Sequence, residues 1–173
     1  MREILYRGKR VELVNGKIVF GDWVYGYYYN NDCPSLLING KHINAEYILV
    51  QDSYGDVHCL GNLGSPSFFQ VLPETVGQFT GLTDKNGKKL FEGDICRVIY
   101  IDRRCNSSGE HYKDENLIIE EVVFKKGTFC FKTTIEDIAM YRPIGFDIYE
   151  KQKIKYFEII GNIHDNPELL ESE

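Results

Sequence analysis

The chain has 173 residues, of which 43% are hydrophobic, and its formal net charge at pH 7 is -6. This length and composition are typical of one globular domain or two small ones, and they exclude a chain too polar to bury a core. The acidic balance argues against general attraction to nucleic-acid phosphates, because that affinity comes from basic side chains that displace counterions.

The N-terminal stretch MREILYRGKR is the first expected strand and is locally basic. Arg2, Arg7, Lys9 and Arg10 outnumber the single acid Glu3. We interpret this stretch as an edge strand whose charges discourage pairing with other chains. The alternative is that the same four basic residues contact a polyanion.

Three Asn-Gly pairs predict β-hairpins, because Asn-Gly readily supplies the positive φ angles of a type I′ turn. They are Asn15-Gly16 between RVELV and KIVF, Asn39-Gly40 between SLLI and KHI, and Asn86-Gly87 between GLTD and KKLF.

Between the first two hairpins, the stretch DWVYGYYYNN predicts an aromatic strand. Alternation along a strand places Trp23, Tyr25, Tyr27 and Tyr29 on one face and Tyr28 on the other. Packing between neighbouring strands is the expected role of these side chains. Stacking on nucleic-acid bases or sugars is the alternative, and all five are candidate interaction residues.

Abundant Tyr and Phe and scarce Met favour a mainly β fold, and the loop-like stretch 61–67 marks a module boundary. We expect an N-terminal β meander over residues 1–75 and a small SH3-like β-barrel over residues 76–173, or one continuous domain. In the second part we expect a polar loop at 102–115 and strands at 94–101, 116–124, 128–133 and 155–163.

Helix signals are few and short. Thr134 and Asp137 resemble an N-cap pair before a short helix that contains Ile138, and Pro143 would end this helix. Near the C-terminus, Asn166 is placed to cap a brief helix over residues 167–170.

The stretch GQFTGLTDKNGKKLFEGDI, residues 77–95, invites a comparison with metal and phosphate loops. A calcium loop that begins at Asp84 would need glycine where Lys89 stands, and a phosphate loop would need Gly-Lys-Ser/Thr before a helix. Neither pattern fits, so we expect this stretch to form turns and not a ligand-binding loop. The expected turn residues are Gly81, Asp84, Asn86, Gly87, Gly93 and Asp94.

Cysteine and histidine spacing indicates no catalytic, metal or cofactor site. The five cysteines are odd in number and widely spaced, which favours reduced thiols. His58 and Cys59 are neighbours, and adjacent strand residues point to opposite faces. Cys130 is expected to be buried, whereas Glu120-Glu121 is expected on a solvated sheet face.

Four segments resemble the YopX family of bacteriophage and prophage proteins. They are MREILYRGKR, DWVYGYYY, PETVGQFTGLTDKNGKKLFEGDI and FEIIGNIHDNPELL, in the family's order. The resemblance implies a small, β-rich, phage-encoded intracellular protein that self-associates, and it brings no catalytic or ligand residue. It adds Gly161 and Asn162 as structural determinants.

These observations favour a noncatalytic, oligomeric protein-interaction module that binds further copies of itself and a host or phage protein through strand edges and aromatics. The alternative is a nucleic-acid-binding small β-barrel. Spatial convergence of the basic N-terminal residues with the aromatic strand would separate the two. No apolar run is long enough to span a bilayer, and a signal peptide is not recognisable, so we expect a cytoplasmic protein without a membrane partner.

Overall fold

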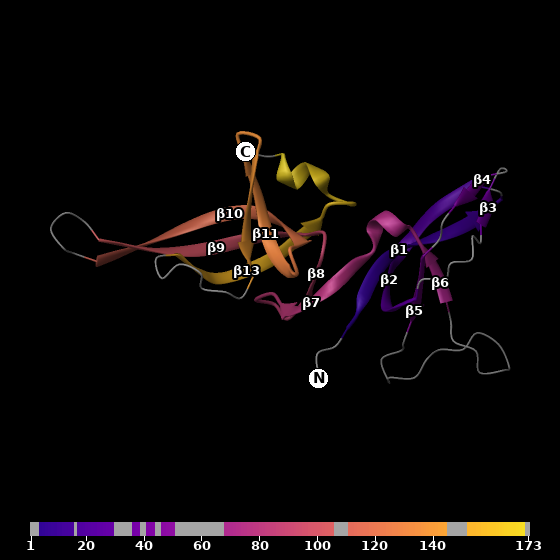
Figure 1. Ribbon diagram of the computed structural model, residues 1–173, viewed down its shortest axis with the longest axis horizontal. Coiled ribbons are helices and arrows are strands. Elements are labelled where there is room, and N and C mark those ends of the chain that lie inside the picture. The colour runs from indigo at the N-terminus through magenta and orange to yellow at the C-terminus, as the bar shows by residue number, and fades with distance from the viewer. Residues whose placement is uncertain are drawn as a thin grey trace. The chain divides into compact units, whose positions relative to one another are not determined.

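The computed structural model describes residues 4–15, 17–29, 36–38, 41–43, 46–50, 68–105, 111–144 and 152–171. The fold is mainly β with antiparallel sheets, as expected, and the described helices are two short 3-10 helices. The chain divides into two compact units, Met1–Phe79 (unit 1) and Thr80–Glu173 (unit 2) (Figure 1). The boundary lies within a strand, whereas the sequence division was placed between residues 75 and 76.

Unit 1 is a meander whose pairings form a closed circuit. Each strand pairs antiparallel with the next, and the last pairs back to the first at Arg10 and Val71. Closure of this kind removes free sheet edges. The four strands are β1 (Tyr6–Val14), β2 (Lys17–Tyr29), β5 (Glu46–Val50) and β6 (Phe68–Val71).

The first two expected hairpins are present in unit 1. β1 and β2 meet at Val14 and Lys17, and Asn15 has a φ of 53°. The small strands β3 (Leu36–Ile38) and β4 (Lys41–Ile43) form the second hairpin. Gly16, the turn at 39–40 and the expected loop at 61–67 lie outside the described residues.

A 3-10 helix, η1 (Pro73–Thr75), leads from β6 into β7 (Gly77–Thr83). The Thr75 hydroxyl accepts a hydrogen bond from the Lys9 backbone N–H at 2.8 Å and donates to the Leu72 carbonyl at 2.8 Å. The first residues of β7 pair with β1, and its later part pairs with β8 (Lys89–Phe91) of unit 2.

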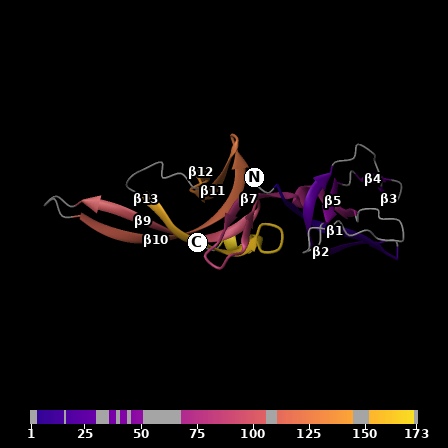
Figure 2. The same cartoon turned by 90° about the horizontal axis from the view of Figure 1, so that it is seen from below.

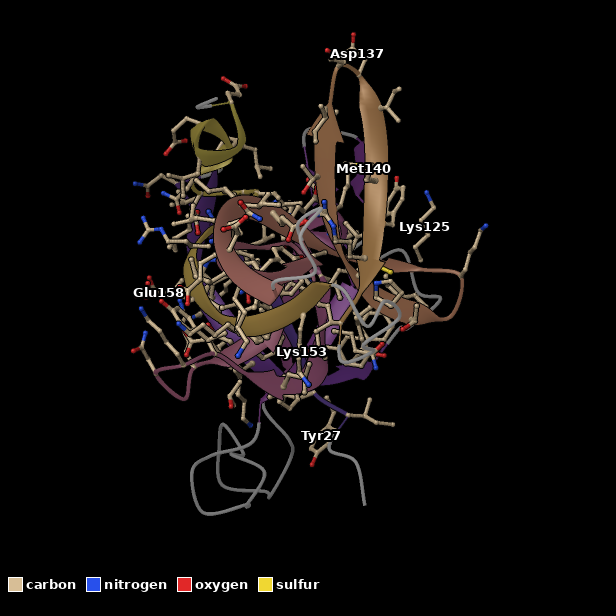
Figure 3. The ribbon with its side chains drawn as sticks, turned by 90° about the vertical axis from the view of Figure 1, so that its left-hand side faces the viewer. Tyr27, Lys125, Asp137, Met140, Lys153 and Glu158 are labelled. Atoms are coloured by element: carbon tan, nitrogen blue, oxygen red, sulfur yellow. The ribbon has the colours of Figure 1, made fainter. Side chains whose placement is uncertain are left out.

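Unit 2 contains a five-stranded antiparallel sheet in the order β12-β11-β10-β9-β13, which curls into a half-barrel (Figure 3). β13 returns beside β9, with two register shifts that mark bulges. The finer SH3-like assignment stays a prediction. The strands are β9 (Asp94–Cys105), β10 (His111–Lys125), β11 (Thr128–Ile135), β12 (Ile138–Pro143) and β13 (Gln152–Asn162).

Two sequence expectations are wrong in unit 2. Residues 102–105 and 111–115 belong to the long β9–β10 ladder, because backbone pairing continues through polar residues that carry no strand signal of their own. Residues 134–143 form the β11–β12 hairpin, not a helix, and the turn residues Glu136 and Asp137 have φ values of 49° and 63°. Residues 106–110 lie outside the described chain.

The core of unit 2 fills the hollow of the curled sheet. Phe131 contacts Phe157 edge to face, with ring centroids 5.5 Å apart. Apolar burial of this kind is the main stabilising contribution to a fold. The buried core residues are Leu90, Cys96, Val98, Tyr100, Val122, Phe129, Phe131, Ile144 and Ile159.

The segment 77–95 ties the β7–β8 hairpin to the sheet. The Asp84 carboxylate accepts backbone N–H bonds from Asn86 at 2.8 Å and Lys88 at 2.9 Å, and one from Ile159 on β13 at 3.2 Å. Gly87 donates to the Asp84 carbonyl at 3.0 Å and has a φ of 81°. Asn86 does not have a positive φ, so the expected type I′ turn is wrong and the loop is a type I turn followed by a left-handed glycine.

Gly93 and Asp94 form a second connection. The Asp94 carboxylate, which is buried, accepts a bond from the Phe91 N–H at 2.8 Å. Gly93 has a φ of 79° and donates its N–H to the Val122 carbonyl at 2.8 Å, while its own carbonyl accepts from Ile163 at 2.9 Å. The turn therefore joins β8 to β10 and to the end of β13.

The second 3-10 helix, η2 (Pro167–Leu170), lies against β10. It starts at the expected proline, although the Asn166 side chain makes no capping hydrogen bond. Its approach explains Gly161, since a Cβ there would lie 2.7 Å from Asn166 Oδ1 and 2.8 Å from Leu169 Cδ1. Among the described residues, no helix has the length and apolar character needed to cross a bilayer.

Candidate functional site

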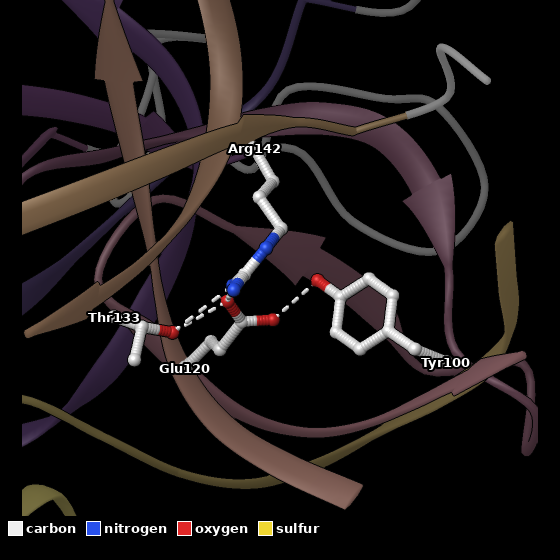
Figure 4. A network of polar contacts seen from close by, with 4 residues as sticks. All are labelled: Tyr100, Glu120, Thr133 and Arg142. Carbon is white, nitrogen blue, oxygen red and sulfur yellow. Dashed lines mark hydrogen bonds and ion pairs between the residues drawn. The ribbon is translucent and has the colours of Figure 1, made fainter. Parts of the chain in front are cut away.

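A fully buried carboxylate, Glu120 on β10, lies at the centre of a polar cluster (Figure 4). Its Oε2 accepts the Tyr100 hydroxyl at 2.5 Å, and its Oε1 accepts the Thr133 hydroxyl at 2.6 Å and an Arg142 N–H. The four residues come from β9, β10, β11 and β12, so the cluster joins four consecutive strands. The expectation of a solvated face at this position is wrong.

The electrostatics of the cluster favour a structural role. Burial, followed by the Glu120 charge, raises the pKa of the Tyr100 hydroxyl far above its ordinary value, so this hydroxyl stays protonated and donates. The Arg142 guanidinium is half-buried and also lies 5.2 Å from the centroid of the Tyr100 ring. Charge-assisted bonds to Glu120 therefore hold the last part of β12 against the sheet.

The β11–β12 hairpin projects from the unit with Asp137 at its tip (Figure 3). Large apolar side chains are exposed along it: Ile135 by 50%, Ile138 by 66%, Met140 by 37% and Tyr141 by 36%. Apolar side chains gathered on a projecting element are typical of an interaction surface. Ile135, Ile138 and Met140 lie on one face of the hairpin and Tyr141 lies on the other, and we name the exposed apolar area of these four residues the hairpin surface.

The hairpin surface includes a sheet edge. Within the described parts of the chain, β12 pairs with β11 alone. The segment Ile138–Tyr141 has no charged residue, and charges are the usual protection of an edge. At the other edge of this sheet, β13 is covered differently: Lys85 donates its N–H to the Phe157 carbonyl at 3.1 Å, and Ile159 donates to Asp84.

The predicted aromatic strand forms part of the surface of unit 1. Tyr25 and Tyr27 are 46% and 43% exposed, and Trp23 is half-buried. On the opposite face, Tyr28 contacts Tyr6 with ring centroids 5.2 Å apart. The side chain of Tyr29 lies outside the described residues.

Part of the basic N-terminal stretch meets this aromatic strand. The register places Arg7 opposite Tyr25 and Lys9 opposite Trp23. The Arg7 guanidinium and the Lys9 ammonium lie 4.7 and 5.8 Å from the Trp23 ring centroid. Arg7 is buried in this position, Arg10 lies 4.5 Å from the Phe69 ring, and Arg2 is outside the described residues.

The described residues contain no group of three or more His, Cys, Asp or Glu side chains that could hold a metal ion. Cys96 and Cys130 are buried free thiols, and burial raises the pKa of each. Cys33 and Cys59 lie outside the described residues, as does the side chain of Cys105.

A depression of about 180 Å³ lies between η2 and the β10–β11 face. Its lining combines Leu169 and Leu170 with a Lys132–Glu121 ion pair whose atoms are 2.7 Å apart. The charged lining residues are Glu121, Glu171 and Lys132, so the depression offers no excess of positive charge to an anionic ligand.

The sequence did not predict the hairpin surface or the Glu120 cluster. A signal for the hairpin was present, because Ile135 and Ile138 flank the Glu136-Asp137 pair as strand ends flank a two-residue turn. No sequence pattern near Glu120 indicates the cluster, since its partners Tyr100, Thr133 and Arg142 lie 20, 13 and 22 residues away in the chain.

Comparison with known proteins gives one family. The sequence model of the YopX protein family matches residues 28–171. Among solved structures, the chain is similar to the crystal structure of protein EF1440 from Enterococcus faecalis, with 21% sequence identity over 95% of this chain and 97% of that chain and a TM-score of 0.37. No curated protein matches the chain.

Proposed function

The chain belongs to the YopX family, and on that premise we propose that it is a noncatalytic protein-interaction module, encoded by a phage or prophage and acting in the bacterial cytoplasm. Binding takes place through the hairpin surface, and self-association is its first consequence. The observation that carries the proposal is the exposure of Ile138 and its apolar neighbours on a sheet edge that the described residues leave uncovered.

Two features of the molecule support this role. Antiparallel sheet edges bind other chains through backbone hydrogen bonds, with side chains adding specificity. The Glu120 cluster holds Arg142 at the base of β12, which keeps the edge in one position before a partner arrives. An interaction surface that is already ordered loses less conformational entropy on binding.

Light scattering over a micromolar dilution series tests the proposal. We expect a mass above one chain for the wild type and a shift toward one chain for Ile138→Lys, because a buried lysine at the interface would lose hydration. Leu117→Lys is the matched control, since Leu117 is an equally large apolar residue in the same sheet and is 53% exposed. A mass of one chain at every concentration of wild type would contradict self-association.

The aromatic strand is a second candidate contact of the same module. Tyr27→Glu and Tyr28→Glu, made separately, probe its two faces by light scattering. Tyr27 is exposed, so its substitution should leave the fold intact and lower the mass only if that face is in the interface. Tyr28 contacts Tyr6, so its substitution needs a parallel check of folding by circular dichroism.

A nucleic-acid-binding role is favoured by one observation, the register that places Lys9 beside Trp23 and near exposed Tyr25. Aromatic stacking combined with a nearby cation suits single-stranded nucleic acid. Fluorescence anisotropy with a labelled single-stranded oligonucleotide tests it. Binding that weakens with salt and with Lys9→Glu would support this role, and unchanged anisotropy at micromolar protein would exclude it.

A further inference from the structure

We infer that the hairpin surface binds a second copy of this chain by antiparallel pairing of β12 with β12, with Met140 on the two-fold axis. The inference rests on the proposed interaction function and names its partner and geometry. It follows from the direction of the backbone groups, the register and the charges at the two ends of the hairpin.

The turn fixes which backbone groups of β12 face outward. Ile135 pairs with Ile138 across a two-residue turn, and both turn residues have positive φ. In such a hairpin the pair next to the turn exchanges both N–H···O bonds, and the bonded pairs then alternate along the ladder. The N–H and C=O groups of Ile138 and Met140 therefore face β11, whereas those of Ala139 and Tyr141 face away from it.

Only one symmetric register uses both outward-facing residues. With Met140 on the axis, Ala139 of each copy lies opposite Tyr141 of the other, and the two pairs make four backbone hydrogen bonds. An axis at Tyr141 would place Ala139 opposite Pro143, which has no N–H. An axis at Ala139 would place Tyr141 opposite Asp137 in the turn. A two-fold axis also makes the contact closed, as in most soluble homodimers.

Charge complementarity supports a second copy of this chain as the partner of β12. The tip of the hairpin is acidic, with Glu136 and Asp137, and both residues are exposed. At the other end of β12, the Lys125 ammonium lies over the Tyr141 ring. Antiparallel pairing places the acidic tip of each copy opposite Pro143 of the other, on the side of Lys125. Parallel pairing would instead place the two acidic tips together, which is unfavourable.

Projection of the hairpin allows a second copy to approach. Its tip, labelled Asp137, and the neighbouring Met140 lie away from the body of unit 2 (Figure 3). A strand added at β12 would extend the five-stranded sheet and cover Ile138 and Met140, which are 66% and 37% exposed.

Cysteine cross-linking tests the register. On the axis, Met140 faces its own copy in a non-hydrogen-bonded pair with Cα atoms about 4.5 Å apart, which suits a disulfide. Met140→Cys, with Cys33, Cys59 and Cys105 replaced by serine, should form a covalent dimer under mild oxidation. Ile138→Cys in the same background is the control, because its copies would be about 13 Å apart along the strands.

A second variant tests the outward-facing bonds. Ala139→Pro removes an N–H that faces the partner and leaves the β11 bonds of Ile138 and Met140 in place. We expect circular dichroism like that of the wild type and dimer dissociation at a concentration at least about tenfold higher, because several bonds and the strand geometry are affected.

The outcomes separate this inference from the proposed function. Efficient cross-linking at residue 140 with little at residue 138, together with weaker association of Ala139→Pro, supports β12 pairing. If Ile138→Lys dissociates an assembly but neither of these effects occurs, β12 pairing is wrong and the interaction function stands. A monomeric wild type at all concentrations overturns both.

Discussion

At the scale of single residues, Asp84 shows how one side chain can hold two segments. Burial acts to raise the pKa of its carboxyl, but the backbone N–H groups of Lys88, Ile159 and Asn86 outweigh this, and the pKa lies below its ordinary value of 3.8. The charged form is therefore the stabilising one, and the expected turn residue Asp84 also fixes the β7–β8 hairpin on β13.

Asp84→Asn should lower the free energy of unfolding by about 1 to 3 kcal/mol at pH 7, because one accepting oxygen becomes a donor facing an N–H. A lowered pKa in the folded state stabilises above pH 3.8 and loses its effect as the pH falls through the folded-state pKa. The difference between wild type and variant in urea melts should thus be full at pH 7 and shrink below about pH 4.

Glu168→Gln is the control for this pH dependence, because Glu168 is an exposed carboxylate on η2. It should change the unfolding free energy little at either pH. If the difference in unfolding free energy between wild type and Asp84→Asn stayed constant down to pH 3, the charge of Asp84 would not be what stabilises the turn.

Gly87 has a backbone conformation that a β-branched residue adopts poorly. Gly87→Val should destabilise the fold by about 1 to 2 kcal/mol through backbone strain. A Cβ at this position would meet no atom within 4 Å, so packing clashes do not contribute. Gly87→Asn should lower the free energy of unfolding less, since Asn tolerates positive φ. Equal urea midpoints for Gly87→Val and the wild type would contradict backbone strain at this position.

At the scale of elements, the β11–β12 hairpin depends on the Glu120 cluster. Arg142→Met should lower the unfolding free energy by about 2 to 4 kcal/mol, because a buried carboxylate loses its cationic partner. The double variant Glu120→Leu, Arg142→Met should recover part of the loss, because no uncompensated buried charge remains, whereas the Tyr100 and Thr133 hydroxyls lose their acceptor. Urea melts of the single and double variants measure both effects, and a double variant less stable than the single one would contradict this account.

Local turn chemistry made the β1–β2, β3–β4 and β7–β8 hairpins predictable, because Asn-Gly pairs specify a reversal within a few residues. The β11–β12 hairpin was missed for the same reason. Glu136 is uncommon at a position with positive φ, and Thr134 with Asp137 imitates a helix cap. Pairing of Ile138–Pro143 with β11 decides the outcome, and that is a tertiary effect.

The cluster of Glu120 could not be predicted for a different reason. Alternation along β10 predicts only that Glu120 and Glu121 point to opposite faces. Which face is covered depends on the curl of the sheet and on Tyr100, Thr133 and Arg142. The β9–β10 register pairs Glu120 with Cys96 and Tyr100 with Asn116, so strand pairing alone does not place Tyr100 beside Glu120. The alternating pattern predicts strand at 94–101, 116–124, 128–133 and 155–163, but not the side on which the sheet curls.

At the scale of the whole molecule, each of the two units handles its strand edges differently. Unit 1 joins its last strand to its first, whereas unit 2 remains a half-barrel whose β12 edge is bare among the described residues. An acidic chain with an apolar strand edge that the described residues leave uncovered suits pairing with another chain better than binding to a polyanion.

The reactivity of the buried thiols reports whether unit 2 stays closed. Cys96 and Cys130 lie in unit 2, and burial raises the pKa of both, so little reactive thiolate forms at pH 8. Iodoacetamide should leave both unmodified in native protein, and modification of each should appear over the same urea range as the loss of the circular dichroism signal. Peptide mass spectrometry distinguishes these two cysteines from the other three, and the intact mass of untreated protein should correspond to reduced thiols. Rapid alkylation of Cys96 without denaturant would mean that the half-barrel opens far more readily than its packing implies.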